Sequence, residues 1–505
     1  MLFRSDATVI GKTGRARLVL VAPSSESNQD AWDAEWVDAE EQRHRLVAKR
    51  FPAAAAAKPP AAQQPQADAS KEHELADKRA PPSTTPATAT ASFPVMRPFG
   101  AYGRNAYPTE EPLIVFQNAT IWTSGPEGVL ENASLVVAKE KIQAVGKDLA
   151  IPPHAKVIDC RGKFLSPGII DCHSHMATDG GVNESGRAVT SQVRIGDFID
   201  DTDISVYRQL AGGVTAAHIL HGSANPIGGQ SQVIKLRWGA SPEAMKMAEA
   251  PPTIKFALGE NVKQSNWGER ATSRYPQTRM GVEQLFRDEF LAAREYRDRW
   301  KDWERNHEGM PPRRDLELEA IVEVLEGRRL VHCHSYRQDE ILALLRVAEE
   351  FHFTIACLQH ILEGYKVADA IARHGAGGSS FSDWWAYKFE VIDSIPHNGA
   401  LMHRAGVVVS FNSDDRELAR HLNQEAAKAV RYGGVSPVEA FKFVTLNPAR
   451  QLHIDKFVGS LEPGKDADLV VWNAPPLSNF ARPEQTWVDG RRMFDSNEDR
   501  ELRAG

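Results

Sequence analysis

The chain has 505 residues, enough for two or three domains and a large buried core. Its 60 Lys and Arg residues against 67 Asp and Glu residues give a formal net charge of -7, which excludes the basic surface expected of a nucleic-acid-binding protein. No apolar stretch reaches the roughly 18 residues of a membrane span. We therefore expect a small-molecule substrate, with neither nucleic acid nor membrane as partner, and leave a homo-oligomer open.

The cysteines and the N-terminus do not identify the compartment. The four cysteines are scattered and form no CxxC pair, so neither a disulfide framework nor a thiolate zinc site is expected. The opening residues "MLFRSDATVIGK" lack the charged and then apolar pattern of a secretory signal. Cytoplasmic and periplasmic locations both stay open.

The first hundred residues differ from the rest in composition. Residues 1–50 contain a strand-like "ARLVLVA" and an acidic stretch expected to be helical. They are too few for a core of their own, so we interpret them as the remnant of an upstream domain. Residues 51–105 are dominated by Ala, Pro and polar residues with little to bury, which is typical of a disordered linker.

Strand and helix patterns begin at residue 110. Residues 110–168 and 455–500 carry short alternating strands and are expected to form one composite β-sandwich domain. Between them, over 169–454, eight strand-like runs alternate with helical segments, which predicts a (β/α)8 TIM-like barrel of the α/β class. A doubly wound open sheet is the competing layout, but it gives no reason for polar residues to recur at so many strand ends. A charged helical insertion, 265–316, is expected to cover the mouth of the barrel.

The stretch "GIIDCHSHM" places His173 and His175 at the end of an apolar run. Side chains alternate along a strand, so both imidazoles fall on one face. A single buried histidine is most often a hydrogen-bonded core residue, whereas a pair at this spacing after a Pro-Gly turn indicates a metal site. Neutral imidazole nitrogens bind zinc and related metals, and carboxylates complete the ligand set.

Other strand ends supply matching residues. Active sites of barrels lie at the C-terminal ends of the strands, so polar residues that end a strand are the candidates. Six metal ligands are expected in all: His173, His175, Glu260, His334, His360 and Asp414. Four imidazoles and two carboxylates suffice for one or two divalent ions, with zinc as the expected metal.

Several of these motifs resemble a known family. "PGIIDCHSH", the single histidines ending strands five and six, and "NSDD" on strand eight are similar to the amidohydrolase superfamily. "TLNPARQL" and "GSLEPGKDADLVVW" resemble the closing segment of that superfamily, so the resemblance spans residues 110–500. The segments "HGSANPIGGQSQVIKLRWG", "KFALGENVKQSNWG" and "HCHSYRQDE" resemble a bacterial branch called imidazolonepropionase-like. The resemblance implies a metal-dependent hydrolase.

Two ligand choices depend on position along a strand. His332 and His334 share a strand face, but a rise of about 3.3 Å per residue puts His332 about 6.6 Å deeper, so His334 is the expected ligand. Many members of the superfamily bridge their metals with a carboxylated lysine on strand four, and Lys255 is a candidate for that role. It lies about 16 Å before Glu260 and on the opposite strand face, so Glu260 is preferred.

The strand-eight aspartate is also a choice between neighbours. Asp414 follows a serine, as the strand-eight aspartate of the superfamily does, and is expected to act as the general base. Asp415 suits the N-cap of a helix before "RELARHL".

Further polar and aromatic residues near the predicted mouth are weaker candidates. Trp384 and Trp385 follow strand seven and are candidates for a pocket wall. Five residues are candidates for substrate contacts, although each is also suited to hydrogen bonding within a loop: His221, Asn225, Asn261, Gln338 and Tyr365.

These residues favour hydrolysis of a C–N amide bond in a cyclic amide, an N-acyl amino acid or a dipeptide. A single-metal deaminase on the same barrel is one alternative. In the superfamily such enzymes usually carry a glutamate three residues after the strand-five histidine, and that position here is Arg337. A non-catalytic module of a larger duplicated protein is the other alternative.

Overall fold

The computed structural model describes the strands at residues 17–21, 31–37 and 43–49, together with residues 96–99, 102–384 and 386–504. The chain divides into two compact units, Met1–Thr90 and Ala91–Gly505. Each unit is described by itself.

The N-terminal unit contains a three-stranded antiparallel sheet. In it, β1 (Arg17–Val21) pairs with β2 (Ala31–Val37), and β2 pairs with β3 (Arg43–Lys49). The expected acidic helix is therefore wrong. In "AWDAEWV", Trp and Ala alternate with Asp and Glu, which is the period of two that a strand requires. The assignment of these residues to an upstream domain stays a prediction.

Most of the predicted linker lies outside the described residues, but its end belongs to the second unit. Arg97 and Arg104 exchange two main-chain hydrogen bonds of 2.9 Å, and Trp238 Nε1 donates to the Tyr102 carbonyl at 2.8 Å. The Tyr102 ring lies 4.9 Å from that of Tyr207. The disorder expected up to residue 105 is therefore wrong for 96–99 and 102–105, because Arg97, Tyr102 and Arg104 find partners that an Ala/Pro segment lacks.

Two truncations test this boundary. A chain beginning at residue 92 is expected to keep the metal content and the free energy of unfolding of the second unit. A chain beginning at residue 106 loses the hydrogen bond to Tyr102 and that from Arg104 to the Met493 carbonyl. At about 1 kcal/mol each, these bonds predict a loss of about 2 kcal/mol in urea unfolding. Equal unfolding midpoints for the two chains would contradict the boundary.

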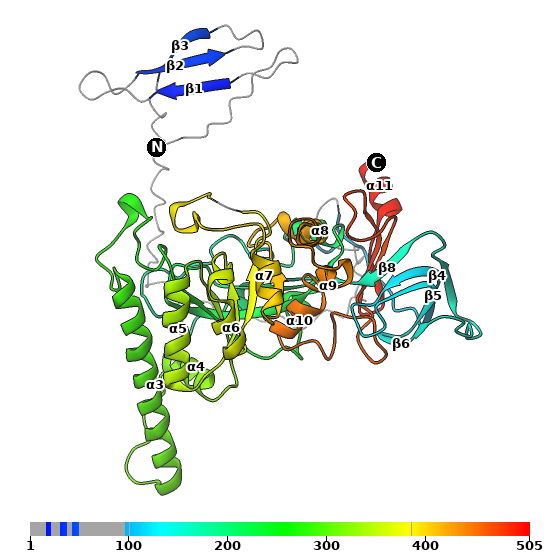
Figure 1. Ribbon diagram of the computed structural model, residues 1–505. Coiled ribbons are helices and arrows are strands. Elements are labelled where there is room, and N and C mark those ends of the chain that lie inside the picture. The colour runs from blue at the N-terminus through cyan, green and yellow to red at the C-terminus, as the bar shows by residue number, and fades with distance from the viewer. Residues whose placement is uncertain are drawn as a thin grey trace, which may run out of the picture. The chain divides into compact units, whose positions relative to one another are not determined.

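The second unit contains a barrel sheet of eight strands in sequential order, with helices along its side (Figure 1). A main-chain hydrogen bond brings the first and last strands of this sheet together: the Asp414 N–H, just after the last strand, donates to the His173 carbonyl in the first at 2.9 Å. The strands are β9 (Ile169–Ser174), β10 (Val214–Ile219), β11 (Ile227–Lys235), β12 (Thr253–Ala257), β13 (Leu330–His334), β14 (Ile355–Gln359), β15 (Gly377–Ser380) and β16 (Val409–Phe411).

One strand of the barrel departs from the parallel pattern. β11 runs antiparallel to both β10 and β12, whereas the remaining ladders of this sheet are parallel. The reason is the short loop 220–226, which returns the chain directly instead of carrying it back through a helix.

Most helices of the second unit pack outside the barrel through apolar residues, whereas the last, 496–504, packs on the C-terminal strands of the chain. Among the described residues, no helix is both long and apolar enough to cross a membrane. The helices are α1 (Ile204–Leu210), α2 (Pro242–Met245), α3 (Arg279–Asn306), α4 (Leu316–Leu325), α5 (Gln338–Phe351), α6 (Ala368–His374), α7 (Asn398–Arg404), α8 (Leu422–Gly433), α9 (Pro437–Lys442), α10 (Leu446–Gln451) and α11 (Ser496–Ala504).

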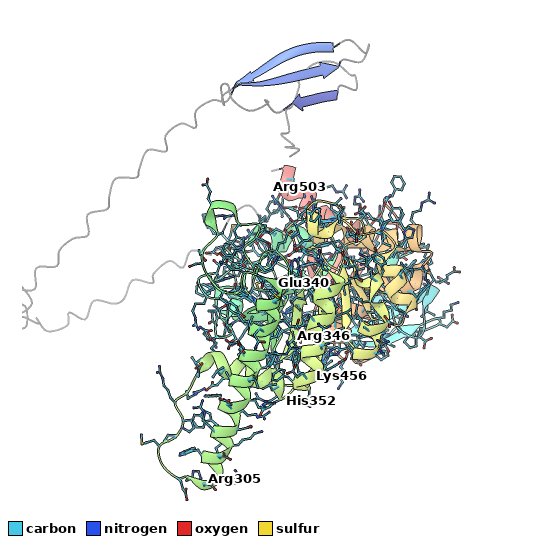
Figure 2. All side chains as sticks on the ribbon, turned by 60° about the vertical axis from the view of Figure 1, so that its left-hand side comes forward. Arg305, Glu340, Arg346, His352, Lys456 and Arg503 are labelled. Carbon is cyan, nitrogen blue, oxygen red and sulfur yellow. The ribbon has the colours of Figure 1, made fainter. Side chains whose placement is uncertain are left out.

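The long helix α3 lies on the side of the barrel and does not cover its mouth. Phe286 stacks on Phe256 of β12 at 5.4 Å, and Phe290 stacks on Phe353 at 4.6 Å. Phe353 lies two residues before the start of β14, so Phe290 lies near the N-terminal ends of the strands and the rest of α3 continues beyond them (Figure 1). Figure 2 shows Arg305 at the far tip. The apolar residues of its first half make α3 an outer barrel helix.

A second sheet joins the two segments that flank the barrel. β17 pairs antiparallel with β8, so C-terminal strands extend a sheet begun before the barrel. These strands form one sheet of eight; its description as a two-layer sandwich stays a prediction. The strands are β4 (Leu113–Trp122), β5 (Val129–Ala138), β6 (Lys141–Gly146), β7 (Lys156–Asp159), β8 (Phe164–Pro167), β17 (Leu469–Trp472), β18 (Pro483–Val488) and β19 (Arg491–Asp495).

A buried group of charges connects the barrel to the second sheet. Lys235, the last residue of β11, is 1% exposed. Its Nζ lies 2.6 Å from Asp466, 3.2 Å from Asp468 and 2.5 Å from Asp489. Burial by itself lowers the pKa of Lys235, but the three carboxylates outweigh burial and raise it above the usual value. The lysine therefore stays charged and holds three acidic side chains together.

Candidate active site

Three strand ends converge at the C-terminal end of the barrel. His173 lies near the end of β9, His360 follows β14, and Asp414 follows β16. One Asp414 carboxylate oxygen lies 3.3 Å from His173 Nε2, and the other lies 3.6 Å from His360 Nε2. One ligand atom from each residue falls within 4.8 Å of the others, a spacing at which the three can share a metal ion. We call these three residues the His–His–Asp group.

His175 joins the His–His–Asp group just beyond the end of β9. Its Nε2 lies 3.0 Å from the Asp414 oxygen that also faces His173. Its Nδ1 lies 3.1 Å from the Leu220 carbonyl, which can only accept, so Nδ1 carries the proton of the neutral ring. The lone pair is therefore on Nε2, the atom that faces Asp414. Metal-ligating histidines are oriented by the same kind of hydrogen bond.

His334 lies beside this group, and His332 lies at a different depth. The rings of His334 and His360 are 5.1 Å apart. His332 packs instead against His218 at 4.6 Å, and His218 bonds to the Thr253 hydroxyl at 2.8 Å. Thr253 begins β12, so His332 belongs to a polar layer closer to the N-terminal ends of the strands.

Lys255, and not Glu260, is the strand-four side chain that contacts the histidines. Lys255 is buried, and its Nζ lies 3.1 Å from His173 Nε2. β12 ends at Ala257, and Gly259 turns the chain with a φ of +91°, so Glu260 lies beyond the strand and is partly exposed. The preference for Glu260 is therefore corrected. Counting residues along one straight strand left out this turn.

Burial keeps the imidazoles neutral and the aspartate ionised. Desolvation lowers the pKa of His173 and His360 well below the usual value. Burial by itself would raise the pKa of Asp414, but His360, His173 and His175 outweigh it and hold that pKa well below its ordinary range. At neutral pH the site therefore offers lone pairs on nitrogen together with one carboxylate.

The donor set fits a divalent cation. Both nitrogens of His360 and Nε2 of His334 are buried without a hydrogen-bond partner among the described residues. Such unpaired polar atoms are costly unless something binds them. Imidazole nitrogen and carboxylate oxygen are donors suited to zinc and similar ions, so the residues present fit a bound metal.

Asp171, in the same motif as His173, fixes the last strand against the first. It is fully buried and accepts from the Ser413 N–H at 3.1 Å and from the Ser413 hydroxyl. Ser413 directly precedes Asp414. Sequence reasoning missed this residue, although a carboxylate inside an apolar run such as "GIIDC" is itself a sign that a specific partner exists.

The neighbouring aspartates have different surroundings. Asp414 has a φ of +50° and faces the histidines. Asp415 Oδ1 accepts from the N–H groups of Glu417 and Leu418 at 2.6 and 2.8 Å, where η5 (Leu418–His421) begins. Asp415 is therefore a helix-capping residue, and Asp414 is the aspartate that faces the histidines.

An aromatic wall lies beside the histidines. Phe381 stacks on His360 at 5.0 Å, and Tyr336 lies 4.4 Å from His334. Among its residues the sequence had indicated only Trp384; position 385 lies outside the described residues. "HCHSY" held the missed signal, since alternation puts a tyrosine two residues after His334 on the same face. The wall consists of Tyr336, Phe381, Trp384 and Tyr387.

The five expected substrate contacts lie in loops or at a helix start around the barrel. His221 accepts from a main-chain N–H and donates to a carbonyl, both at 2.9 Å. Asn225 donates to two main-chain carbonyls at 2.7 Å, Asn261 to a serine hydroxyl at 2.8 Å, and the Tyr365 hydroxyl to a carbonyl at 2.9 Å. Gln338 begins α5. The structure thus gives four of them a role in holding loops, and their contact with substrate stays a prediction.

Metal content tests the correction at strand four. Lys255→Met is expected to lower the metal bound per chain by at least half, because the side chain beside His173 is lost. Glu260→Gln is the matched control and is expected to leave metal content unchanged. Elemental analysis of both purified variants measures the difference. Loss of metal in the Glu260→Gln variant alone would instead support Glu260 as the strand-four ligand.

Comparison with known proteins finds amidohydrolases and an imidazolonepropionase. A model of the amidohydrolase family matches residues 392–493. Amidohydrolase tasK of Hapsidospora irregularis is 33% identical over 376 residues, which is 68% of this chain but 38% of that protein. An imidazolonepropionase of Pseudomonas savastanoi pv. phaseolicola is 26% identical over 405 residues, covering 72% of this chain and 92% of the other.

A solved structure extends the likeness to the fold. The crystal structure of an amidohydrolase from Thermotoga maritima MSB8 matches with a TM-score of 0.70 and 32% sequence identity. The match covers 76% of this chain and 100% of the Thermotoga chain. The relative is covered along its whole length at 32% identity, and the barrel with its converging strand ends agrees with this likeness. The chain therefore belongs to the amidohydrolase family.

Proposed function

We propose that this protein is a metal-dependent hydrolase of a C–N amide bond, acting on a cyclic amide, an N-acyl amino acid or a dipeptide. The observation that carries the proposal is the convergence of two neutral imidazoles and an ionised carboxylate within 4.8 Å at the C-terminal end of the barrel. Membership of the amidohydrolase family supports it.

The proposed metal ligands are the His–His–Asp group with His175 and His334, and zinc is the proposed ion. In this proposal Lys255 is the strand-four residue that would be carboxylated to bind the metal, since its Nζ faces His173. A divalent cation held there supplies a polarised carbonyl and a water acidic enough to attack at neutral pH. Whether one or two ions bind is a question for elemental analysis.

Asp414 is the proposed proton carrier. Its two oxygens face three imidazoles, so one oxygen can bind the proposed metal while the other accepts the proton of the attacking water. The same carboxyl group then gives that proton to the leaving nitrogen, which completes the hydrolysis. Asp171 and Ser413 position Asp414 without contacting the substrate.

The aromatic wall is the proposed boundary of the substrate pocket. Tyr387 donates to the Tyr336 hydroxyl at 2.9 Å, and Lys388 Nζ lies 4.3 Å from the centre of the Tyr336 ring. An apolar surface suits the acyl chain of an N-acyl amino acid. Lys388, the cation at its border, also pairs with the buried carboxylate of Glu390 at 2.8 Å.

The deaminase alternative lacks its expected acid. Arg337 occupies the position of that glutamate, and its guanidinium pairs with Asp339 at 3.0 Å at the start of α5. No observation in the described residues favours deamination over amide hydrolysis.

A substrate panel on the full chain tests the proposal. Metal content is measured first, and then amine release from N-acyl amino acids, dipeptides and cyclic amides is compared with ammonia release from amidines and nucleobases. At least one equivalent of metal and turnover of one amide class are expected. Ammonia release alone would favour the deaminase, and a metal-free chain without turnover would favour the non-catalytic module.

A further inference from the structure

A cavity of about 480 Å³ lies away from the His–His–Asp group, between α1, η5, the start of β18 and α11. None of the proposed metal ligands lines it. Four arginines do: Arg208, Arg420, Arg482 and Arg503. Figure 2 shows Arg503 near the end of α11. The volume lies within the range of small-molecule sites, which is about 300–1,000 Å³.

This arginine cavity has more guanidinium groups than carboxylates paired with them. Glu417 is shared by Arg208 at 2.7 Å and Arg420 at 3.3 Å. Arg503 pairs with Asp499 at 2.9 Å. Four guanidinium groups against these two carboxylates leave two positive charges.

Arg482 is the least compensated of the four arginines. Its Nη1 donates only to the main-chain carbonyls of Asn479 and Ala481, at 3.0 and 2.7 Å. His421 also lines the cavity: burial, Arg420 and Arg482 lower its pKa and outweigh Glu425 and Glu417, which raise it. The cavity therefore favours an anion over a neutral or cationic ligand.

Two largely buried aromatic side chains contribute to the inner wall of the cavity. Trp472 is 1% exposed and Tyr207 is 7% exposed, and both line the cavity. Tyr207 is held in place by its hydroxyl, which donates to Asp499 at 3.1 Å, and by Tyr102 at 4.9 Å. Rigid aromatic faces next to guanidinium groups suit a planar ring that carries the negative charge at its edge.

We propose that the arginine cavity binds a small planar aromatic anion of the aryl phosphate class. A phosphate monoester carries nearly two negative charges at neutral pH, which matches the two positive charges without partners. Its oxygens suit the forked donors of arginine. The ring of the ligand contacts the small exposed parts of Trp472 and Tyr207. This inference is independent of the proposed hydrolase activity.

Calorimetric titration of the full chain tests the proposal, with phenyl phosphate, inorganic phosphate and isophthalate as probes. Phenyl phosphate is expected to bind with a Kd below about 1 mM, and at least tenfold more tightly than either other probe. Equal binding of inorganic phosphate would overturn the aromatic requirement, and equal binding of isophthalate would overturn the choice of phosphate. Absence of phenyl phosphate binding would overturn the site.

Variants locate the bound probe. Arg482→Gln and Arg420→Gln are each expected to weaken phenyl phosphate at least tenfold, because each removes one charged donor. Arg305→Gln, at the exposed tip of α3, is the control and should leave Kd unchanged (Figure 2). Removing metal with a chelator should also leave Kd unchanged. Unaltered binding in both cavity variants, or loss of binding on chelation, would place the anion elsewhere and overturn the proposal.

Discussion

Asp414→Asn is expected to slow amide hydrolysis by about 10²- to 10⁴-fold, the usual effect of losing a general base. Asparagine keeps the shape and one oxygen but cannot accept a proton at neutral pH. The loss of charge beside three imidazoles also weakens metal binding, but does not abolish it, because the histidines remain. Steady-state rates on the best amide of the substrate panel measure the effect.

Asp415→Asn is the matched control for this experiment. Asp415 accepts two main-chain hydrogen bonds at the start of η5, so its substitution should cost about 1 kcal/mol of stability and leave turnover close to that of the unaltered protein. Near-normal turnover in Asp414→Asn would refute the mechanism. Collapse in Asp415→Asn alone would show that the neighbouring aspartate carries the proton.

Lys235→Met is expected to lower the free energy of unfolding by about 3–5 kcal/mol, because it leaves carboxylates in the protein interior without their shared cation. Urea unfolding at pH 7 measures the loss. Without the lysine, the buried carboxyls bind protons more tightly in the folded than in the unfolded chain. The deficit should therefore shrink as pH falls from 7 toward 5 and these groups become neutral.

Lys141→Met is the control for the buried lysine. Lys141 also pairs with Asp466, but its side chain is 44% exposed, so water screens the interaction. The expected loss is within about 1 kcal/mol. Similar losses in both variants would show that burial of the charge group contributes little.

The sequence predicted most barrel strands well because they are apolar runs followed by polar residues. Such a pattern reports that a strand exists and not which way it runs, which is why the direction of β11 was missed. The alternation in "AWDAEWV" was present but outweighed by its acidic composition. The phenylalanines of α3 lie in a segment that its charges marked as an insertion, and only the packing shows that they contact Phe256 of β12 and Phe353 just before β14.

The histidines and Asp414 were accessible from sequence because each ends a strand. Lys255 was not, because its distance from the strand end suggested a deeper position, whereas the long side chain brings Nζ up to His173. Tyr336 and Asp171 stand inside the quoted motifs but were missed, although alternation points to the first and the apolar neighbours point to the second. Contact of the loop candidates with substrate stays a prediction, although main-chain groups already bond to polar atoms of His221, Asn225 and Tyr365.

The contact between the first and last barrel strands has a consequence for synthesis of the protein. Ser413 and His173 meet across 240 positions of chain, and the adjacent Asp414 completes the His–His–Asp group. A nascent chain still on the ribosome holds His173 and His360 long before it holds the aspartate. Because such distant contacts form late, we expect the proposed metal site to be completed only after translation has passed residue 414 and the chain has closed on itself.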